Sequence, residues 1–491
     1  MNCRHGLFAL VACVTFVGSM GAHAATIYIK PDGTGDEPTI QDGINAAAPG
    51  DTLLLASGTF LGAGNKDVFV GGKDVVVMSE SGSAVTVIDC EGSGRGFLYV
   101  LGETAASVLQ GVTIRNGNPI GSGGAVFCAG SSPNLVDCVF EANTGSGLAG
   151  EGGGAVYCQA GSPSLQGCVF RDNQNPTIDG VGGAIALSGC IQVEILDCSF
   201  EANTTPLAGF SGGGAVFDWF SSRVTISGCE FRGNHSRVGG GVALIETNQA
   251  EVATSMFVGN SAESGGGLGS SSRNLTVTDC QFVRNDAEAG AGANLSFYAM
   301  EFERCLFQDN GSTEWGGAVA SFGASGQYTE CIFSKNSAPL GGAILVSANS
   351  TIIQSCTFHE NNGNEGSIFY TRNGGSATVS NSILAFSIGE VASCAGGGVT
   401  LDCCDVFGTV GGDYVGCLAG QNGVNGNFSA DPLFCGADDK DFTLRSDSPC
   451  APPGVTGCGL VGALPVGCGP TSVVAASWGE IKARYRPGTT R

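Results

Sequence analysis

The 491-residue chain holds few of the side chains that acid–base or nucleophilic enzymes use. Two of its four histidines fall in the first 24 residues, and the other two, His235 and His359, stand beside asparagines with no obvious partner. No lysine lies between Lys73 and Lys335, so the central region lacks the base that a lyase would need. This inventory favours binding over catalysis.

One pair of carboxylates recurs at a spacing that suits glycoside hydrolysis. Glu141 and Glu201 occupy equivalent places in alternate repeats, and two strand spacings would put them about 9.6 Å apart. Inverting glycoside hydrolases separate their two carboxyl groups by about 6.5–9.5 Å. Arg171 stands between the two glutamates, however, and it favours a structural ion pair over catalysis.

Two further groups have a chemical reading and a more ordinary one. Asp438, Asp439 and Asp441 carry the oxygen ligands that calcium prefers, but an acidic turn is the commoner explanation. Trp219 and Trp315 have the flat apolar faces that stack on sugars, although single exposed aromatics need no explanation. We therefore predict no cofactor and keep calcium as the alternative.

The composition limits both the fold and the partners. The 82 glycines are about 17% of the chain against a usual 7%, yet 42% hydrophobic residues exclude a disordered linker. The formal net charge of −23 would repel phosphate or uronate chains. We therefore expect no nucleic-acid partner.

Two short anchors alternate along the middle of the chain, which is the mark of a repeat architecture. The first is Gly-Gly-Ala followed by an aliphatic residue, and its clearest copies begin at Gly123, Gly153, Gly182, Gly213, Gly316 and Gly341. The second is C-x-F-x-x-N, whose cysteines are Cys138, Cys168, Cys198, Cys229, Cys280, Cys305, Cys331 and Cys356. A further copy around Phe257 has serine in place of cysteine.

The second anchor predicts a strand that ends in a corner. Cysteine and phenylalanine at i and i+2 lie on one face of a strand and should face a core. Asparagine tolerates the left-handed turn conformation, and identical asparagines in register can hydrogen-bond amide to amide, as we expect for Asn143, Asn173, Asn203 and Asn234. The glycine pair supplies a second tight bend. Each repeat is then one coil of an all-β solenoid with strands about 4.8 Å apart.

The paired anchors resemble the G-G-A-[ILV] and F-x-x-N repeats of chlamydial polymorphic outer-membrane proteins, within the wider right-handed parallel β-helix and pectin-lyase-like superfamily. The resemblance covers residues 120–385 and implies that fold. Enzymes of the superfamily act on acidic polysaccharides, but the Gly-His-Gly motif of polygalacturonases is absent. The stretch after the repeats is too short for an autotransporter barrel, so we do not expect that mode of display.

The ends of the chain have their own signals. An apolar run followed by Ala22-His23-Ala24 predicts a cleavable export signal at 1–24, and the alternative is a lipoprotein box ending at Cys13. No later stretch is long and apolar enough for a membrane span. We expect a secreted or surface-associated protein. Its further segments are a cap with irregular first coils at 25–119, regular repeats at 120–385, Cys-rich terminal coils at 386–469 and an amphipathic tail at 470–491.

Short motifs refine this division. The stripe of Ile40, Ile44 and Ala47 predicts a short helix that caps the first coil. In the tail, Trp478, Ile481 and Tyr485 stand at helical spacing among basic residues, which predicts a sorting or docking element.

Repeat length varies almost only in the turn after the asparagine. This turn is longest in three consecutive coils, at 144–152, 174–181 and 204–212, which should stack into one ridge. Loops carry function more often than the scaffold, although drift in a tolerant turn explains the lengths equally well. The residues that we predict to form a binding ridge here are Glu151, Asp179, Phe210 and Trp219.

Charged residues alternate in sign along the stack. One run follows the phenylalanines and the other lies one position later: Glu141, Arg171, Glu201 and Arg232, then Arg284, Asp309, Lys335 and Glu360. Opposite charges on neighbouring strands stabilise a sheet by roughly 0.2–1 kcal/mol a pair. We predict structural ladders here.

The chain has 22 cysteines. The eight in C-x-F read as small buried residues, with disulfides between adjacent coils as an alternative. Eight more crowd residues 394–468 and are expected to form disulfides that staple the irregular end, while zinc is the weaker reading.

The sequence therefore predicts an exported surface or extracellular binding or adhesion module that holds a glycan or protein ligand on the loop ridge. A polysaccharide lyase or glycoside hydrolase is the alternative, and an inert structural stalk is a third.

Overall fold

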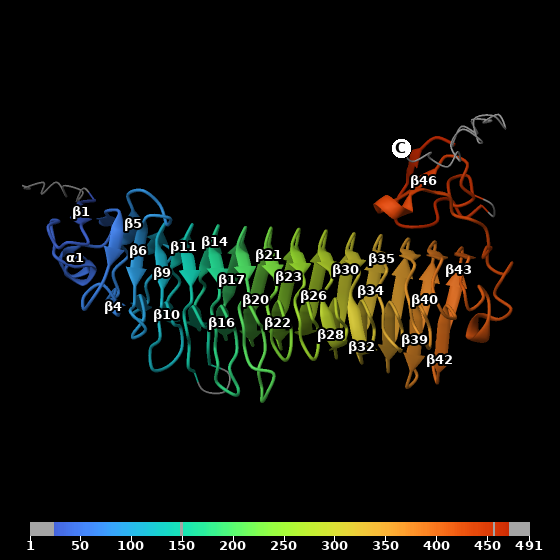
Figure 1. Ribbon diagram of the computed structural model, residues 1–491, viewed down its shortest axis with the longest axis horizontal. Coiled ribbons are helices and arrows are strands. Elements are labelled where there is room, and N and C mark those ends of the chain that lie inside the picture. The colour runs from blue at the N-terminus through green and yellow to red at the C-terminus, as the bar shows by residue number, and fades with distance from the viewer. Residues whose placement is uncertain (1–23, 148–150, 455–456, 471–491) are drawn as a thin grey trace, which may run out of the picture.

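The protein is a right-handed parallel β-helix built from three long sheets (Figure 1). The computed structural model describes residues 24–147, 151–454 and 457–470. Each coil adds one strand to a 13-stranded sheet, then one to a 15-stranded sheet and then one to a 14-stranded sheet, and all pairs within these sheets are parallel.

The bounds of the strands follow the repeat. The 15-stranded sheet contains β1 (Thr26–Ile29), β2 (Thr52–Leu55), β5 (Val76–Ser79), β8 (Val108–Gln110), β11 (Asn134–Val136), β14 (Ser164–Gln166), β17 (Gln192–Leu196), β20 (Arg223–Ser227), β23 (Gln249–Ala253), β26 (Asn274–Thr278), β30 (Ala299–Glu303), β34 (Ser325–Thr329), β37 (Ser350–Gln354), β40 (Ser376–Ser380) and β43 (Gly398–Asp402). The 13-stranded sheet contains β4 (Val68–Phe69), β7 (Phe97–Tyr99), β10 (Val126–Ala129), β13 (Val156–Gln159), β16 (Ile185–Ser188), β19 (Val216–Trp219), β22 (Val242–Ile245), β25 (Leu268–Ser271), β29 (Ala293–Ser296), β33 (Val319–Phe322), β36 (Ile344–Ser347), β39 (Phe369–Arg372) and β42 (Ala392–Ala395). The 14-stranded sheet contains β3 (Gly58–Phe60), β6 (Thr86–Asp89), β9 (Thr113–Arg115), β12 (Val139–Glu141), β15 (Val169–Arg171), β18 (Ser199–Glu201), β21 (Glu230–Arg232), β24 (Met256–Val258), β27 (Gln281–Val283), β31 (Leu306–Gln308), β35 (Ile332–Ser334), β38 (Thr357–His359), β41 (Ile383–Ala385) and β44 (Asp405–Phe407).

The remaining elements are short. They are the helix α1 (Ile40–Ala46), the 3-10 helices η1 (Gly416–Leu418) and η2 (Ala437–Asp439), the paired strands β28 (Asp286–Ala289) and β32 (Gly311–Trp315), and a three-stranded sheet of β45 (Phe434–Gly436), β46 (Asp441–Arg445) and β47 (Val466–Cys468). The three long sheets begin within residues 25–119 and continue to Phe407.

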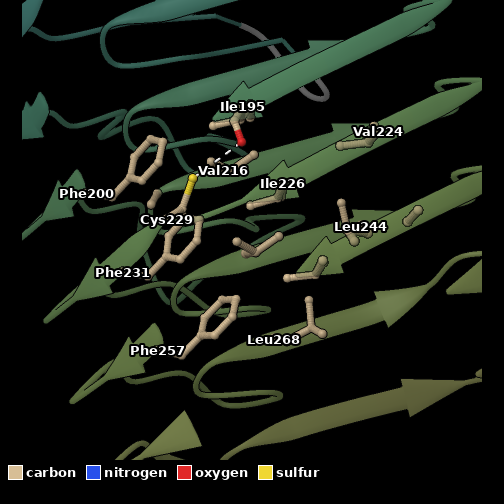
Figure 2. Close-up of a cluster of buried hydrophobic side chains, with 14 of the residues drawn as sticks. Ile195, Phe200, Val216, Val224, Ile226, Cys229, Phe231, Leu244, Phe257 and Leu268 are labelled. Carbon is tan, nitrogen blue, oxygen red and sulfur yellow. Dashed lines mark hydrogen bonds between the residues drawn. The ribbon is translucent and has the colours of Figure 1, made fainter. Parts of the chain in front are cut away.

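A column of phenylalanine rings fills the solenoid along the 14-stranded sheet (Figure 2). From Phe140 to Phe358, nine fully buried rings stack with centroids 4.7–4.9 Å apart, one from each C-x-F or S-x-F motif. The cysteines beside them are buried thiols, and Cys229 Sγ lies 3.4 Å from the carbonyl oxygen of Ile195. The alternative of disulfides between ladder cysteines is wrong, because these eight thiols are all free.

The asparagines form a buried ladder, but they do not take the left-handed conformation. Asn173 Nδ2 donates to Asn203 Oδ1 at 3.0 Å, and the same oxygen accepts the backbone N–H of Asn173 at 3.1 Å. The positive φ falls one residue earlier, at Asp172 (55°) and Ala202 (53°), so that part of the prediction is wrong. The ladder asparagines keep ordinary backbone angles, and their amides are buried in the stack.

The glycine pair allows the second bend. Gly153 has φ of 70°, and a Cβ on Gly154 would lie 2.0 Å from the carbonyl oxygen of Gly183 in the next coil. Only a residue without a side chain fits at such a close approach.

The first coil is capped as predicted. The helix α1 begins after Thr39, whose hydroxyl accepts a hydrogen bond from the Asp42 N–H, and Ile40, Ile44 and Ala47 are buried against the core.

The predicted signal at 1–24, except its last residue, and the tail at 470–491, except Pro470, lie outside the described residues.

The other end folds back as a C-terminal lobe, residues 429–454 and 457–470, which stands on the outer face of the 14-stranded sheet (Figure 1). Three disulfides are present in the Cys-rich region: Cys394–Cys417, Cys403–Cys458 and Cys435–Cys468. The prediction that this region is stapled is confirmed for six of its eight cysteines. Cys404 and Cys450 are instead buried thiols, since Cys404 continues the ladder of the solenoid with Sγ 3.4 Å from the Val379 carbonyl.

Candidate functional site

The three long turns lie side by side at one edge of the 13-stranded sheet. Parallel bridges join Thr144 to Gln174 and Gln174 to Thr204 where the turns begin, and join Gly152, Val181 and Gly212 where they end. The Thr177 hydroxyl also donates to the Gly147 carbonyl at 3.1 Å. The described parts of these turns therefore stack coil upon coil.

The last long turn, 204–212, is held from both sides. Asp179 Oδ1 in the preceding coil accepts the backbone N–H of Phe210 at 2.7 Å. Arg237 in the following coil donates to the Gly209 carbonyl at 2.7 Å, and the Thr205 hydroxyl donates to Ser236 Oγ at 2.8 Å. The turn is thus fixed before any ligand arrives, which lowers the entropy cost of binding.

This turn carries an aromatic cluster at the surface. The ring of Phe210, 47% exposed, lies 5.6 Å from Trp219 and 6.4 Å from Phe217 between ring centroids. Phe220 stacks on Trp219 at 5.1 Å and is 57% exposed. Phe217 is buried beneath them among Val181, Ala186 and Ala243. Of the four predicted ridge residues, the structure therefore brings together Asp179, Phe210 and Trp219.

Phe220 is held in an unfavourable conformation. Its φ is 60°, in the left-handed region that bulky residues rarely adopt, and the equivalent corners of neighbouring coils hold Gly189 and Glu246. The same corner has a positive φ at Ala160, Gly189 and Glu246, so the backbone follows the repeat and the bulky exposed ring is the unusual feature. Phe297 repeats the arrangement three strands further on, with φ of 73° and 72% exposure, but no ring contact joins it to the cluster.

The remaining predicted aromatic and ridge residues lie apart. Glu151 is exposed in the first long turn, whose residues 148–150 are outside the described structure. Trp315 belongs to a second apolar group, where it meets Phe322 edge-on at 5.7 Å and the guanidinium of Arg372 lies 4.9 Å from its ring. Neither residue contributes to the aromatic cluster.

A niche opens on the other side of turn 204–212, where the long turns give way to short ones. Leu207 forms one wall of this cavity of about 290 Å³, and the short turns of the next coils form the rest. Its lining residues are Leu207, His235, Ser261, Ala262, Glu263, Asp286, Ala287, Glu288 and Thr313.

His235 has a partner that the sequence reading missed. Its Nδ1 lies 2.7 Å from Ser261 Oγ, and Asp286 follows Ser261 one rung further along the stack. The three residues each stand directly after a ladder asparagine, and this equal place in consecutive repeats was the available signal. The expectation that His235 lacks a partner is wrong.

The carboxylates that line the niche lie in different electrostatic environments. Burial raises the pKa of Asp286, and it has no charged partner among the described residues. Glu263 instead forms an ion pair with Arg237 at 2.8 Å, and Arg237 is the residue that also holds turn 204–212. One carboxyl group with a raised pKa and another held in an ion pair stand in different environments, as the acid and the base of a hydrolase do.

The first predicted charge ladder is in register and only partly paired. Glu141, Arg171, Glu201 and Arg232 are direct neighbours across strands β12, β15, β18 and β21. Arg171 Nη2 lies 3.1 Å from Glu141 Oε2, and the pKa of Arg171 is raised by that carboxylate and further by Glu201. Arg232 turns to Glu230 of its own strand instead of Glu201.

The second run occupies the strained corner itself. Arg284, Asp309, Lys335 and Glu360 all have positive φ, because they are the residues that precede the ladder asparagines. Lys335 pairs with Glu360 at 3.3 Å, whereas Asp309 accepts a hydrogen bond from Gln308. These eight charges lie on the outside of the solenoid and do not converge on a cavity.

Two further observations concern metals and membranes. Within residues 24–147, 151–454 and 457–470, no three His, Cys, Asp or Glu side chains are grouped so that they could hold a metal ion. Asp441 uses its carboxylate to accept the Thr443 N–H, and Asp438 and Asp439 lie in η2. The same described ranges contain no helix of the length and apolarity needed to cross a membrane.

Comparison with known proteins supports the class that the strand pairing defines. A family model described as a right-handed β-helix region matches residues 175–326. The fold of the chain is therefore that of a right-handed parallel β-helix. The resemblance of its repeats to those of chlamydial polymorphic outer-membrane proteins stays a prediction.

Two solved structures are weakly similar. One is the crystal structure of pectate lyase Pel9A, with 12% identity, coverage of 91% of this chain and 98% of that chain, and a TM-score of 0.29. The other is a GH136 lacto-N-biosidase from Eubacterium ramulus, with 13% identity, coverage of 77% and 68%, and a TM-score of 0.32. No curated protein matches the chain significantly.

Proposed function

We propose that the chain is an extracellular or cell-surface binding module that holds a glycan on the aromatic cluster of Phe210, Trp219 and Phe220. The observation that carries this proposal is the cluster itself, which is exposed, strained at Phe220 and fixed by hydrogen bonds to Asp179 and Arg237. The export signal predicted at 1–24 and the three disulfides support an oxidising compartment.

The chemistry of the surface favours a neutral glycan. Aromatic rings bind the apolar faces of sugar rings, and nearby polar groups such as Asp179 supply acceptors for hydroxyls. The net charge of −23 opposes a uronate chain. A protein ligand is the competing partner, and failure of the chain to bind any glycan of the panel below would favour it.

The experiment measures binding of the purified full chain to immobilised neutral glycans (cellulose, mannan, xylan, chitin) and acidic ones (polygalacturonate, alginate). We expect binding within the neutral group and a loss of tenfold or more, about 1.4 kcal/mol, in Trp219→Ala. The control is Phe297→Ala, which removes a 72% exposed phenylalanine outside the cluster, from the corner equivalent to that of Phe220. Equal affinity of Trp219→Ala and the wild type, or binding to acidic chains alone, would overturn the proposal.

A second candidate function, glycoside hydrolysis, draws support from the niche. Asp286, whose pKa burial raises, would protonate the leaving oxygen, and Glu263 or Glu288 would act on water or on the sugar. Turn 204–212 contributes both Phe210 to the aromatic cluster and Leu207 to the niche, so one glycan could reach both.

Hydrolysis and binding are separated by product. Release of reducing ends from a neutral glycan that disappears in Asp286→Asn, with binding retained, would establish hydrolysis. Ultraviolet absorbance of unsaturated products would indicate a lyase. Binding without either product is the outcome that the main proposal expects.

A further inference from the structure

The C-terminal lobe covers part of the solenoid and buries two titratable side chains beneath it. Its residues Leu444, Cys450, Ala451 and Val461 pack in one cluster with Phe428, just before the lobe, and with Ile383 and Ala385 on the outer face of the 14-stranded sheet. The Cys403–Cys458 disulfide ties the lobe to the turn before β44. The contact is therefore a packed surface with one covalent tether.

Asp405 lies inside this contact without a cation. The side chain is fully buried, Oδ1 accepts the Ala430 N–H at 3.0 Å and the Cys450 thiol lies 3.2 Å from Oδ2. No lysine, arginine or histidine pairs with Asp405 in the described ranges. A buried carboxylate that lacks a counter-ion favours its neutral form, and burial together with Asp413 and Asp431 raises the pKa of Asp405 to about 7.

His359 lies under the same lobe with the opposite preference. The side chain is 4% exposed and is surrounded by the rings of Phe386, Phe434 and Phe442, with centroids 5.6, 5.7 and 5.1 Å away. Its Nδ1 has no hydrogen-bond partner and lies 3.8 Å from Glu360 Oε2.

The charges around His359 act in both directions. Burial lowers its pKa and Lys335 lowers it further, whereas Glu360 and Asp438 oppose this. Two of the caging rings, Phe434 and Phe442, belong to the lobe.

We propose that the C-terminal lobe is a pH-responsive cover of the 14-stranded sheet, which docks in mildly acidic surroundings and loosens toward neutral and alkaline pH, with Asp405 driving the response and His359 opposing it. When the lobe lifts, water reaches Asp405 and its pKa returns toward the ordinary 3.8. Docking is then strongest below that value and is lost as pH rises to about 7.

His359 has the reverse effect. Its pKa in the docked state lies below 6.5, so acid favours the lifted state through this residue alone. Replacing each group should therefore expose the effect of the other. Asp405→Asn should leave a lobe that loosens only in acid, and His359→Phe should leave one that tightens more steeply as pH falls.

The test measures hydrogen exchange of β45 and β46 and maleimide labelling of Cys450, under non-reducing conditions, from pH 5 to pH 8. Rates are expressed relative to Asp405→Asn at each pH, which cancels the intrinsic pH dependence of the chemistry. We expect the wild-type ratio to rise tenfold or more between pH 5 and pH 8 while core Cys229 stays unlabelled.

A constant ratio across this range would overturn the proposal. If Asp405→Asn does not fold, the comparison of the wild type with His359→Phe replaces it. A lobe whose exchange falls no more steeply with acid in that variant than in the wild type would refute the proposal equally.

Discussion

The carboxylate of Asp179 accepts a 2.7 Å hydrogen bond from the backbone N–H of Phe210, which lies one coil further along the solenoid. The bond joins two long turns that differ in sequence, and it fixes the place from which the Phe210 ring leaves the backbone. The position of the aromatic cluster therefore depends on a side chain that is not aromatic.

This dependence gives a first prediction. Asp179→Ala removes the acceptor, so turn 204–212 should sample more conformations and glycan affinity should fall about three- to tenfold, which is about 0.7–1.4 kcal/mol. Thermal stability should hardly change, because the turn lies outside the core. Asp179→Asn keeps a carbonyl acceptor and should restore most of the affinity. A binding isotherm for each variant decides the matter, and equal affinities for Ala and Asn would refute the positioning role.

Replacement of Phe220 by glycine should weaken glycan binding without lowering the stability of the fold. Phe220→Gly relieves a left-handed conformation that costs a bulky residue about 1–2 kcal/mol, and glycine is the residue found at this corner in the preceding coil, as Gly189. We expect the variant to unfold at an equal or higher denaturant concentration while binding glycan more weakly. A variant that loses stability instead would show that the exposed ring contributes packing that its surroundings do not suggest.

Arg171 lies between Glu141 and Glu201, so its replacements should rank by charge. Arg171→Glu should be less stable than Arg171→Gln by roughly 0.2–1 kcal/mol, because three like charges would then stand on neighbouring strands. The difference should shrink in 1 M salt, since these side chains are partly exposed. Denaturant melts at two salt concentrations measure both effects, and identical midpoints for the two variants would contradict a ladder.

Asp218 is the buried acid of the central core. It faces inward between Leu187 and Leu244, accepts hydrogen bonds from the hydroxyls of Ser221 and Thr247, and burial raises its pKa to about 6. Because the folded state holds the proton more tightly, its contribution to stability is complete below about pH 4 and is lost as pH rises to about 6.

The test of Asp218 compares pH profiles. The free energy of unfolding of the wild type should fall by about 2–3 kcal/mol more than that of Asp218→Asn between pH 4 and pH 6.5. The variant keeps the other titrating groups, Asp405 included, so the difference isolates one residue. Parallel profiles would mean that the pKa of Asp218 is the same in the folded and unfolded states, which would contradict the shift.

Much of the fold could be predicted because the same two motifs recur in many coils. The Phe200 and Phe282 rings are buried as the C-x-F pattern requires, and α1 caps the core through Ile40 and Ile44. Less of the candidate functional site could be predicted from the sequence. Phe220 is neither glycine nor asparagine, so its own residue type does not indicate the positive φ that it adopts.

Long-range contacts were the other limit. The lobe contacts a part of the solenoid that lies far away in the sequence. The Ala463 N–H donates to Thr357 Oγ1 across 106 residues, and no repeated motif predicts that contact. The lobe buries His359 and Asp405. Because the position of the lobe could not be predicted, His359 was interpreted from the sequence only as a residue near a turn. Pairing among the C-terminal cysteines was undetermined for the same reason.

The asparagine ladder has a sense of direction. From Asn143 to Asn336, every amide donates to the amide of the next coil, so the dipoles of these groups all point the same way along the axis. Hydrogen bonds in such a chain polarise one another. An interruption at Asn234 would divide the chain into two shorter ones, whereas one at Asn143 would only shorten it. Equal substitutions at equivalent positions of this solenoid are therefore not equal in cost.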